Sequence, residues 1–63
     1  SGAVTYGSPV TINVTGLTND GTWGYNNSLE TAWDIETALN SGSITVTALV
    51  SGSHSYRIML FRI

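Results

Sequence analysis

No cysteine occurs in this chain of 63 residues, so it lacks the covalent support on which many domains of this size depend. The chain offers one histidine, His54, and four carboxylates, with no CxxC or HxxxH spacing to bring metal ligands together. We therefore expect neither a metal nor a cofactor. At this length the chain can form only a single β-rich domain, residues 1–63. Its stability must come from close packing or from association with other chains.

The composition favours association. Charged residues make up 10% of the chain, against about 25% in an average soluble protein, and lysine is absent. Such a surface does little to repel copies of itself. Arg57 and Arg62 are the only basic side chains apart from the histidine, too few to neutralise a run of phosphates, so we expect no nucleic-acid partner. Threonine, serine and asparagine supply the polarity, which favours an extracellular or virion location.

The sequence also indicates how the chain relates to membranes. No apolar run approaches the ~18–20 residues that are needed to span a bilayer. No positively charged and then apolar segment of the signal-peptide kind opens the chain. We therefore expect a soluble protein with no membrane partner.

Alternating hydropathy predicts a strand near the start of the chain. Val10, Ile12 and Val14 alternate with threonine and asparagine, which is the pattern of a strand with one buried face. Pro9 marks its beginning, because proline lacks an N–H and suits an edge position. Residues 4–6 form either a shorter leading strand or an extended arm.

A helix is predicted over about 28–40. Asn27 and Glu30 have the spacing of a capping box, and Gly42 follows the far end as a stop. One face is apolar, and its residues are Leu29, Ala32, Ile35 and Leu39.

The last third of the chain predicts a β-hairpin. Residues 44–50 alternate between apolar and polar side chains, and residues 54–63 form a second strand after a three-residue loop, 50–52. The expected fold class is therefore α+β. An antiparallel sheet of three or four strands carries the helix on one face, the face built from even-numbered residues.

The other face of that sheet contains a mismatch in the last strand. Met59, Phe61 and Ile63 are apolar where the neighbouring strands are polar, and no second helix remains to cover them. We interpret these three residues as an oligomer interface, because exposed apolar side chains in a row favour association. The alternative is that the strand bends, or that an arm carrying Val4 and Tyr6 folds over it.

The predicted function is therefore structural. We expect a non-enzymatic subunit that self-associates, or that docks into a larger extracellular or virion assembly such as a capsid decoration, a tail component or a filament. Glu30 and Asp34 are four residues apart on the expected helix, which is typical of a solvated acidic face. His54 lies among turn-forming serines, and no GxSxG motif is present. The sequence therefore predicts no catalytic residues.

A carbohydrate-binding or adhesive module is the alternative function. Residues 16–27 are dense in turn formers and carry Trp23, Tyr25 and Asn26. Flat aromatic rings stack on sugar faces, and amides bond to sugar hydroxyls, so these three residues form a candidate glycan site. The opposing interpretation is that the rings close a small core.

Overall fold

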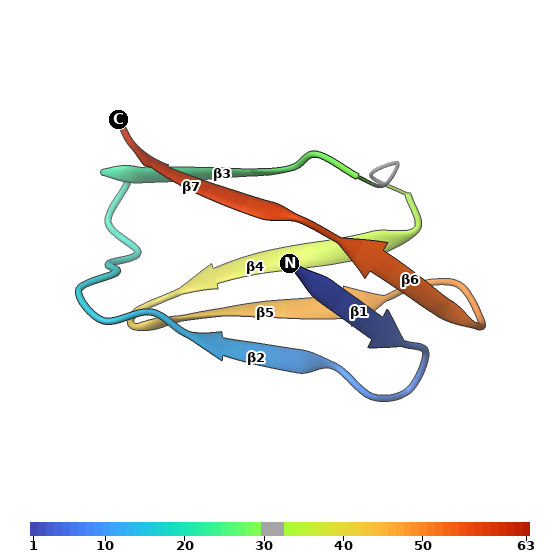
Figure 1. Ribbon diagram of the computed structural model, residues 1–63. Coiled ribbons are helices and arrows are strands. Elements are labelled where there is room, and N and C mark those ends of the chain that lie inside the picture. The colour runs from blue at the N-terminus through green and yellow to red at the C-terminus, as the bar shows by residue number, and fades with distance from the viewer. Residues whose placement is uncertain (30–32) are drawn as a thin grey trace.

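The computed structural model describes residues 1–29 and 33–63, and this part of the chain is all β (Figure 1). It contains seven strands and no helix: β1 Gly2–Thr5, β2 Val10–Asn13, β3 Trp23–Asn27, β4 Ile35–Asn40, β5 Ser43–Ala48, β6 Ser53–Tyr56 and β7 Ile58–Arg62. The strands form three antiparallel sheets, with the orders β1-β6, β2-β5-β4 and β3-β7. Within the described residues no helix is present that is long and apolar enough to cross a membrane.

The sheets are arranged in two layers. The β2-β5-β4 sheet forms one layer and the β3-β7 pair lies across from it, while β1 and β6 close one end (Figure 1). β6 and β7 are separated only by Arg57, and there the chain changes its partner from β1 to β3. Residues 53–62 therefore connect two of the three sheets.

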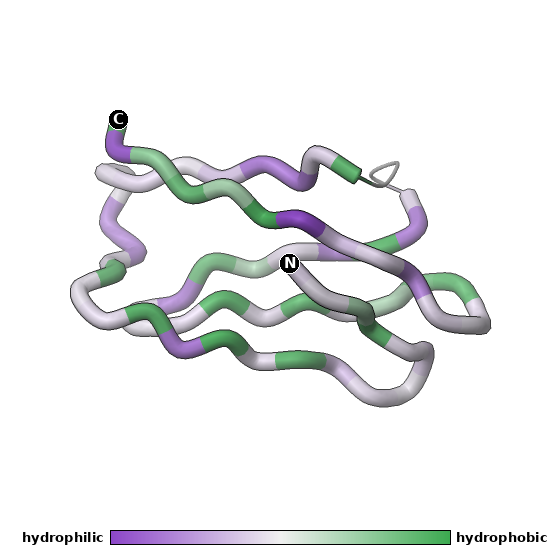
Figure 2. Tube along the Cα trace, in the orientation of Figure 1, coloured by the Kyte–Doolittle hydropathy of each residue, from purple (hydrophilic) through white to green (hydrophobic). Residues whose placement is uncertain are grey.

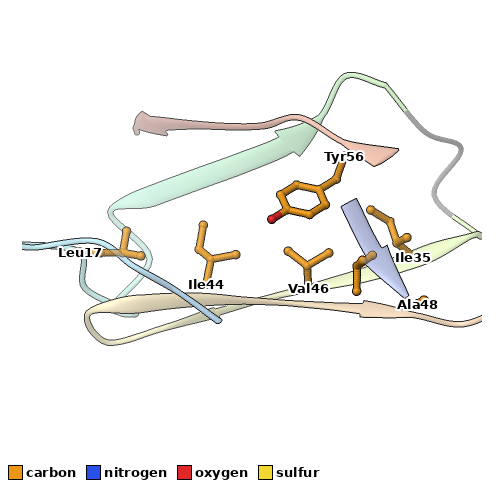
Figure 3. Packing of buried hydrophobic residues seen from close by; sticks show 7 residues of the cluster. Leu17, Ile35, Ile44, Val46, Ala48 and Tyr56 are labelled. Atoms are coloured by element: carbon orange, nitrogen blue, oxygen red, sulfur yellow. The ribbon is translucent and has the colours of Figure 1, made fainter. Parts of the chain in front are cut away.

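The core lies between the layers. Its buried residues are Val4, Leu17, Ile35, Ile44, Val46, Ala48 and Tyr56, six of them labelled in Figure 3. The alternation of apolar and polar residues that places these side chains inside is visible along the strands (Figure 2). The strand predicted from Val10 onward is present as β2, and residues 2–5 form a true strand, β1.

The predicted helix over 28–40 is wrong. Residues 35–40 form β4, which pairs with β5 along its whole length, and residues 30–32 of the prediction lie outside the described residues. Ile35 and Leu39 are four residues apart. Residues with this spacing lie on the same face of a helix and also on the same face of a strand. Burial follows the strand period, because the even-numbered Glu36 and Ala38 are exposed while the odd-numbered positions are more buried.

Gly42 was expected to stop that helix. It lies instead in the two-residue turn between β4 and β5, where Asn40 is paired with Ser43. Its φ of +82° is a conformation that other residues rarely adopt, which explains glycine here. The fold is therefore an all-β domain of three small sheets rather than an α+β domain.

The predicted hairpin between residues 44–50 and 54–63 is also wrong. β5 pairs with β2 along one edge and with β4 along the other, so β5 has no free edge to which β6 could bind. β6 pairs with β1 instead. Residues 49–52 connect β5 in one layer to β6. In this connection the Val50 carbonyl accepts a hydrogen bond from His54 Nε2 at 2.9 Å. Two strands that face each other across a core both direct apolar side chains inward. Two strands that are neighbours in one sheet do the same. Alternation alone does not distinguish these arrangements.

Candidate functional site

Three large apolar side chains, two on β7 and one on the residue that follows it, project away from the core. Met59 is 54% exposed, Phe61 is 48% exposed and Ile63 is 82% exposed. The alternate residues Ile58 and Leu60 pack against the core, so the two faces of this strand are both apolar. We call Met59, Phe61 and Ile63 the β7 outer row. The structure thus brings the residues predicted as an oligomer interface together on one exposed face.

The β7 outer row lies beside a glycine on the neighbouring strand. Gly24 is the direct partner of Phe61 in the β3-β7 pair, and Asn26 is the partner of Met59. A Cβ atom added at Gly24 would collide with Cε1 and Cζ of Phe61, so the ring occupies the space above the glycine backbone. Covering a strand glycine with a cross-strand aromatic ring protects backbone that would otherwise be open to water.

The residues predicted as a glycan site do not share one face. Trp23 is half-buried against the core, and the Arg62 guanidinium carbon lies 4.8 Å from the centroid of its ring. Tyr25 points to the same side of β3, and its hydroxyl donates a hydrogen bond to the Thr37 carbonyl at 2.8 Å. Asn26 alternates with these residues and is exposed on the opposite side of the strand. The two rings therefore help to close the space between the layers.

A hollow of about 320 Å³ lies between β3 and β4. Its lining residues are Tyr25, Asn27, Ile35, Glu36, Thr37 and Leu49. Glu36 is the one ionisable carboxylate among them, and His54 is not part of the lining. The hollow was not expected from the sequence, because it exists only when β4 is a strand that faces β3.

Asn27 lines this hollow and accepts two hydrogen bonds from the backbone. Its Oδ1 accepts hydrogen bonds from the backbone N–H of Arg57 at 2.9 Å and of Leu29 at 3.3 Å. Its buried Nδ2 has no partner within the described part of the chain. Asn27 was predicted to cap a helix, and it does accept a nearby backbone N–H. The bond to Arg57, thirty residues away, fixes the point where β6 gives way to β7.

Asp20 is an exposed carboxylate in the loop that leads from β2 to β3. The pKa of Asp20 lies below its ordinary value, because hydroxyl hydrogen bonds from Thr22 and Thr18 and the backbone N–H of Thr22 favour the ionised carboxylate. These bonds hold the loop that leads from β2 to β3. Residues 1–29 and 33–63 contain no group of three or more histidine, aspartate or glutamate side chains that could hold a metal ion.

Comparison of the chain with protein-family models, with curated proteins and with solved structures finds no match. Inference about function therefore depends on the geometry of the molecule itself. Its most distinctive surface feature is the β7 outer row.

Proposed function

We propose that this protein is a non-enzymatic structural subunit that associates with further copies of itself through the β7 outer row, as part of an extracellular or virion assembly. The observation that carries the proposal is the exposure of Met59 and Phe61 on β7 and of Ile63 directly after it, at alternate positions of the chain. Single exposed apolar residues are common on protein surfaces, whereas an adjoining group of large ones marks an interaction site.

The energy available from covering this row supports the proposal. Removing such side chains from water contributes about 1.5–3 kcal/mol each, so the row represents on the order of 5 kcal/mol per chain. That amount is comparable with the whole free energy of unfolding of a small domain. Association through the row would therefore stabilise the fold as well as build the assembly.

The charge pattern supports a second copy as the partner. The chain carries two arginines and four carboxylates in 63 residues, and the β7 outer row itself contains no charge. A strongly charged partner would gain little from this face, while an identical apolar face is complementary to it. The sparse charge elsewhere leaves little repulsion between copies.

Sedimentation velocity of the full chain tests the proposal. Concentrations from about 10 μM to about 1 mM cover binding free energies of about −7 to −4 kcal/mol. We expect the sedimentation coefficient of the unmodified protein to rise with concentration, and Phe61→Ser to abolish the rise. Leu49→Ser is the matched control, because Leu49 is also 48% exposed but lies outside the β7 outer row. A 6.7 kDa monomer at every concentration would overturn the proposal.

A further inference from the structure

Within residues 1–29 and 33–63, one edge of β7 pairs with no strand. Ser28 N–H donates to the Arg57 carbonyl at 3.0 Å, and Ile63 N–H donates to the Thr22 carbonyl at 2.9 Å. Both bonds continue the register of the β3-β7 pair. The odd-numbered residues of β7 therefore direct their backbone N–H and C=O groups to β3. The residues that direct N–H and C=O groups to the opposite edge are Ile58, Leu60 and Arg62. In the described chain β7 pairs with β3 alone.

The open edge of β7 lies on the same side of the chain as the edge of β6 that pairs with β1. Tyr6 N–H donates to the Gly52 carbonyl at 3.0 Å, so the even-numbered residues of β6 face β1. The first pair of this register is Gly2 with Tyr56, the residue that precedes Arg57 and β7. Figure 1 shows β7 running beyond β1 with no strand along its side away from β3. The edge beyond Tyr56 can therefore accept one more antiparallel strand in line with β1.

The two edges of the β2-β5-β4 sheet are less suited to pairing. On β4 the carbonyl of Thr37 is already bonded to the Tyr25 hydroxyl. β2 starts directly after Pro9, and its outward side chains, Thr11 and Asn13, are polar and exposed. The edge of β7 differs from both because it lies beside the apolar β7 outer row. An unprotected edge with an apolar face is the arrangement that favours strand addition.

We infer that two copies pair antiparallel along the free edges of their β7 strands, about a two-fold axis that passes beside Leu60. The inference rests on the proposed function and specifies how its partner is bound. Leu60 lies opposite Leu60 of the second copy, Met59 lies opposite Phe61, and Ile58 lies opposite Arg62. The two outer rows then join into one apolar face.

A second copy is the occupant that this strand fits best. A strand that pairs with itself about a two-fold axis must be self-complementary, as every such interface is. In the register about Leu60 each arginine faces an isoleucine, so no like charges oppose each other across the pair. The joined sheet runs β3-β7-β7-β3 through both copies and leaves the edge backbone groups of β7 hydrogen-bonded.

Removal of one backbone donor tests the inference. The chain is short enough for chemical synthesis with an N-methyl group on the amide of Leu60. We expect this change to weaken dimerisation at least about tenfold, since the Leu60 N–H groups of both copies are lost from the pair. N-methylation of Thr11 is the control, because Val14 N–H donates to Gly42, which places the Thr11 N–H on the outer edge of β2. Far-UV circular dichroism checks that each product folds.

The register is tested with single cysteines, which the native chain lacks. A mixture of the Met59→Cys and Phe61→Cys proteins should form a disulfide-linked dimer several-fold faster than either protein alone, because only the mixture places two cysteines directly opposite. Dimerisation that survives N-methylation of Leu60, or equal rates in all three samples, would overturn the strand pairing and leave the proposed function standing. Failure of the unmodified protein to associate would overturn both.

Discussion

The ring of Phe61 lies against the backbone of Gly24, so closely that a Cβ added at residue 24 would collide with Cε1 and Cζ of the ring. This contact joins the outward faces of β3 and β7 and holds the aromatic ring in place in the β7 outer row. An interface residue that is already ordered loses less side-chain entropy on binding. Under the proposed function, Gly24 therefore supports the association surface, although it has no side chain.

Gly24→Ala should displace the Phe61 ring. The ring is 48% exposed and can turn away from the new methyl group into a less favourable rotamer, so we expect a fall of about 0.5–1.5 kcal/mol in the free energy of unfolding, measured by urea denaturation at low concentration. The control is the same change in a Phe61→Ala background. There the methyl group meets no ring, and alanine suits a strand better than glycine, so the cost should vanish. An equal cost in both backgrounds would contradict the contact.

Tyr25→Phe removes the hydroxyl that bonds to the Thr37 carbonyl and links the two layers. Tyr25 is 39% exposed, so water replaces part of the lost bond, and we expect a loss of about 0.5–1 kcal/mol in the free energy of unfolding. Tyr6→Phe is the control, because the exposed Tyr6 hydroxyl makes no hydrogen bond within the described residues. Equal effects of the two changes would show that the Tyr25 bond does not contribute.

Asn27→Ala removes the acceptor for the Arg57 N–H at the junction of β6 and β7. Arg57 is exposed, so water replaces part of the lost hydrogen bond, and we expect destabilisation of about 0.5–1.5 kcal/mol by urea denaturation. Asn26→Ala is the control in the same strand, since Asn26 is exposed and should change the free energy of unfolding by no more than about 0.5 kcal/mol. The prediction fails if the two variants unfold at the same urea concentration.

The loop before β3 should respond to acid. The Thr22 hydroxyl lies 2.6 Å from Asp20 Oδ1 and is the largest cause of the lowered pKa of Asp20. A carboxylate whose pKa is lowered by folding stabilises the folded state above its ordinary pKa, near 4, and this stabilisation is lost as the pH falls through the lower folded value. Thr22→Val should raise the pKa of Asp20 in an NMR titration, while Thr15→Val should leave it unchanged. No rise with Thr22→Val would contradict the hydrogen bond.

The sequence predicted where most strands lie, because alternation reports which side chains are buried. β2, β5 and the strand that ends the chain all follow it, and so does the outward direction of Met59, Phe61 and Ile63. The prediction failed at β4 because residues spaced by four fit two periodicities. The apparent cap at Asn27 then favoured the helix, although its side chain reaches Arg57, thirty residues away. Contacts at that separation leave no local pattern.

Strand pairing was harder to predict than strand position. Alternation defines an inner and an outer face, but it does not show whether two strands lie side by side or across the core from each other. β5 and β6 lie across the core from each other, although the sequence predicted them as neighbours. For this reason the hollow between β3 and β4 and the open edge of β7 were not expected. Both features depend on the order of strands in the sheets.

Hydrogen exchange of the Leu60 amide, measured by NMR at two protein concentrations, tests most directly whether copies join at β7. We expect exchange at Leu60 to slow markedly at the higher concentration, because pairing with a second copy bonds this N–H. Exchange at Thr11, on the outer edge of β2, should not change. If Leu60 exchanges equally fast at both concentrations while the protein remains folded and associates, copies of this chain do not pair along the edge of β7.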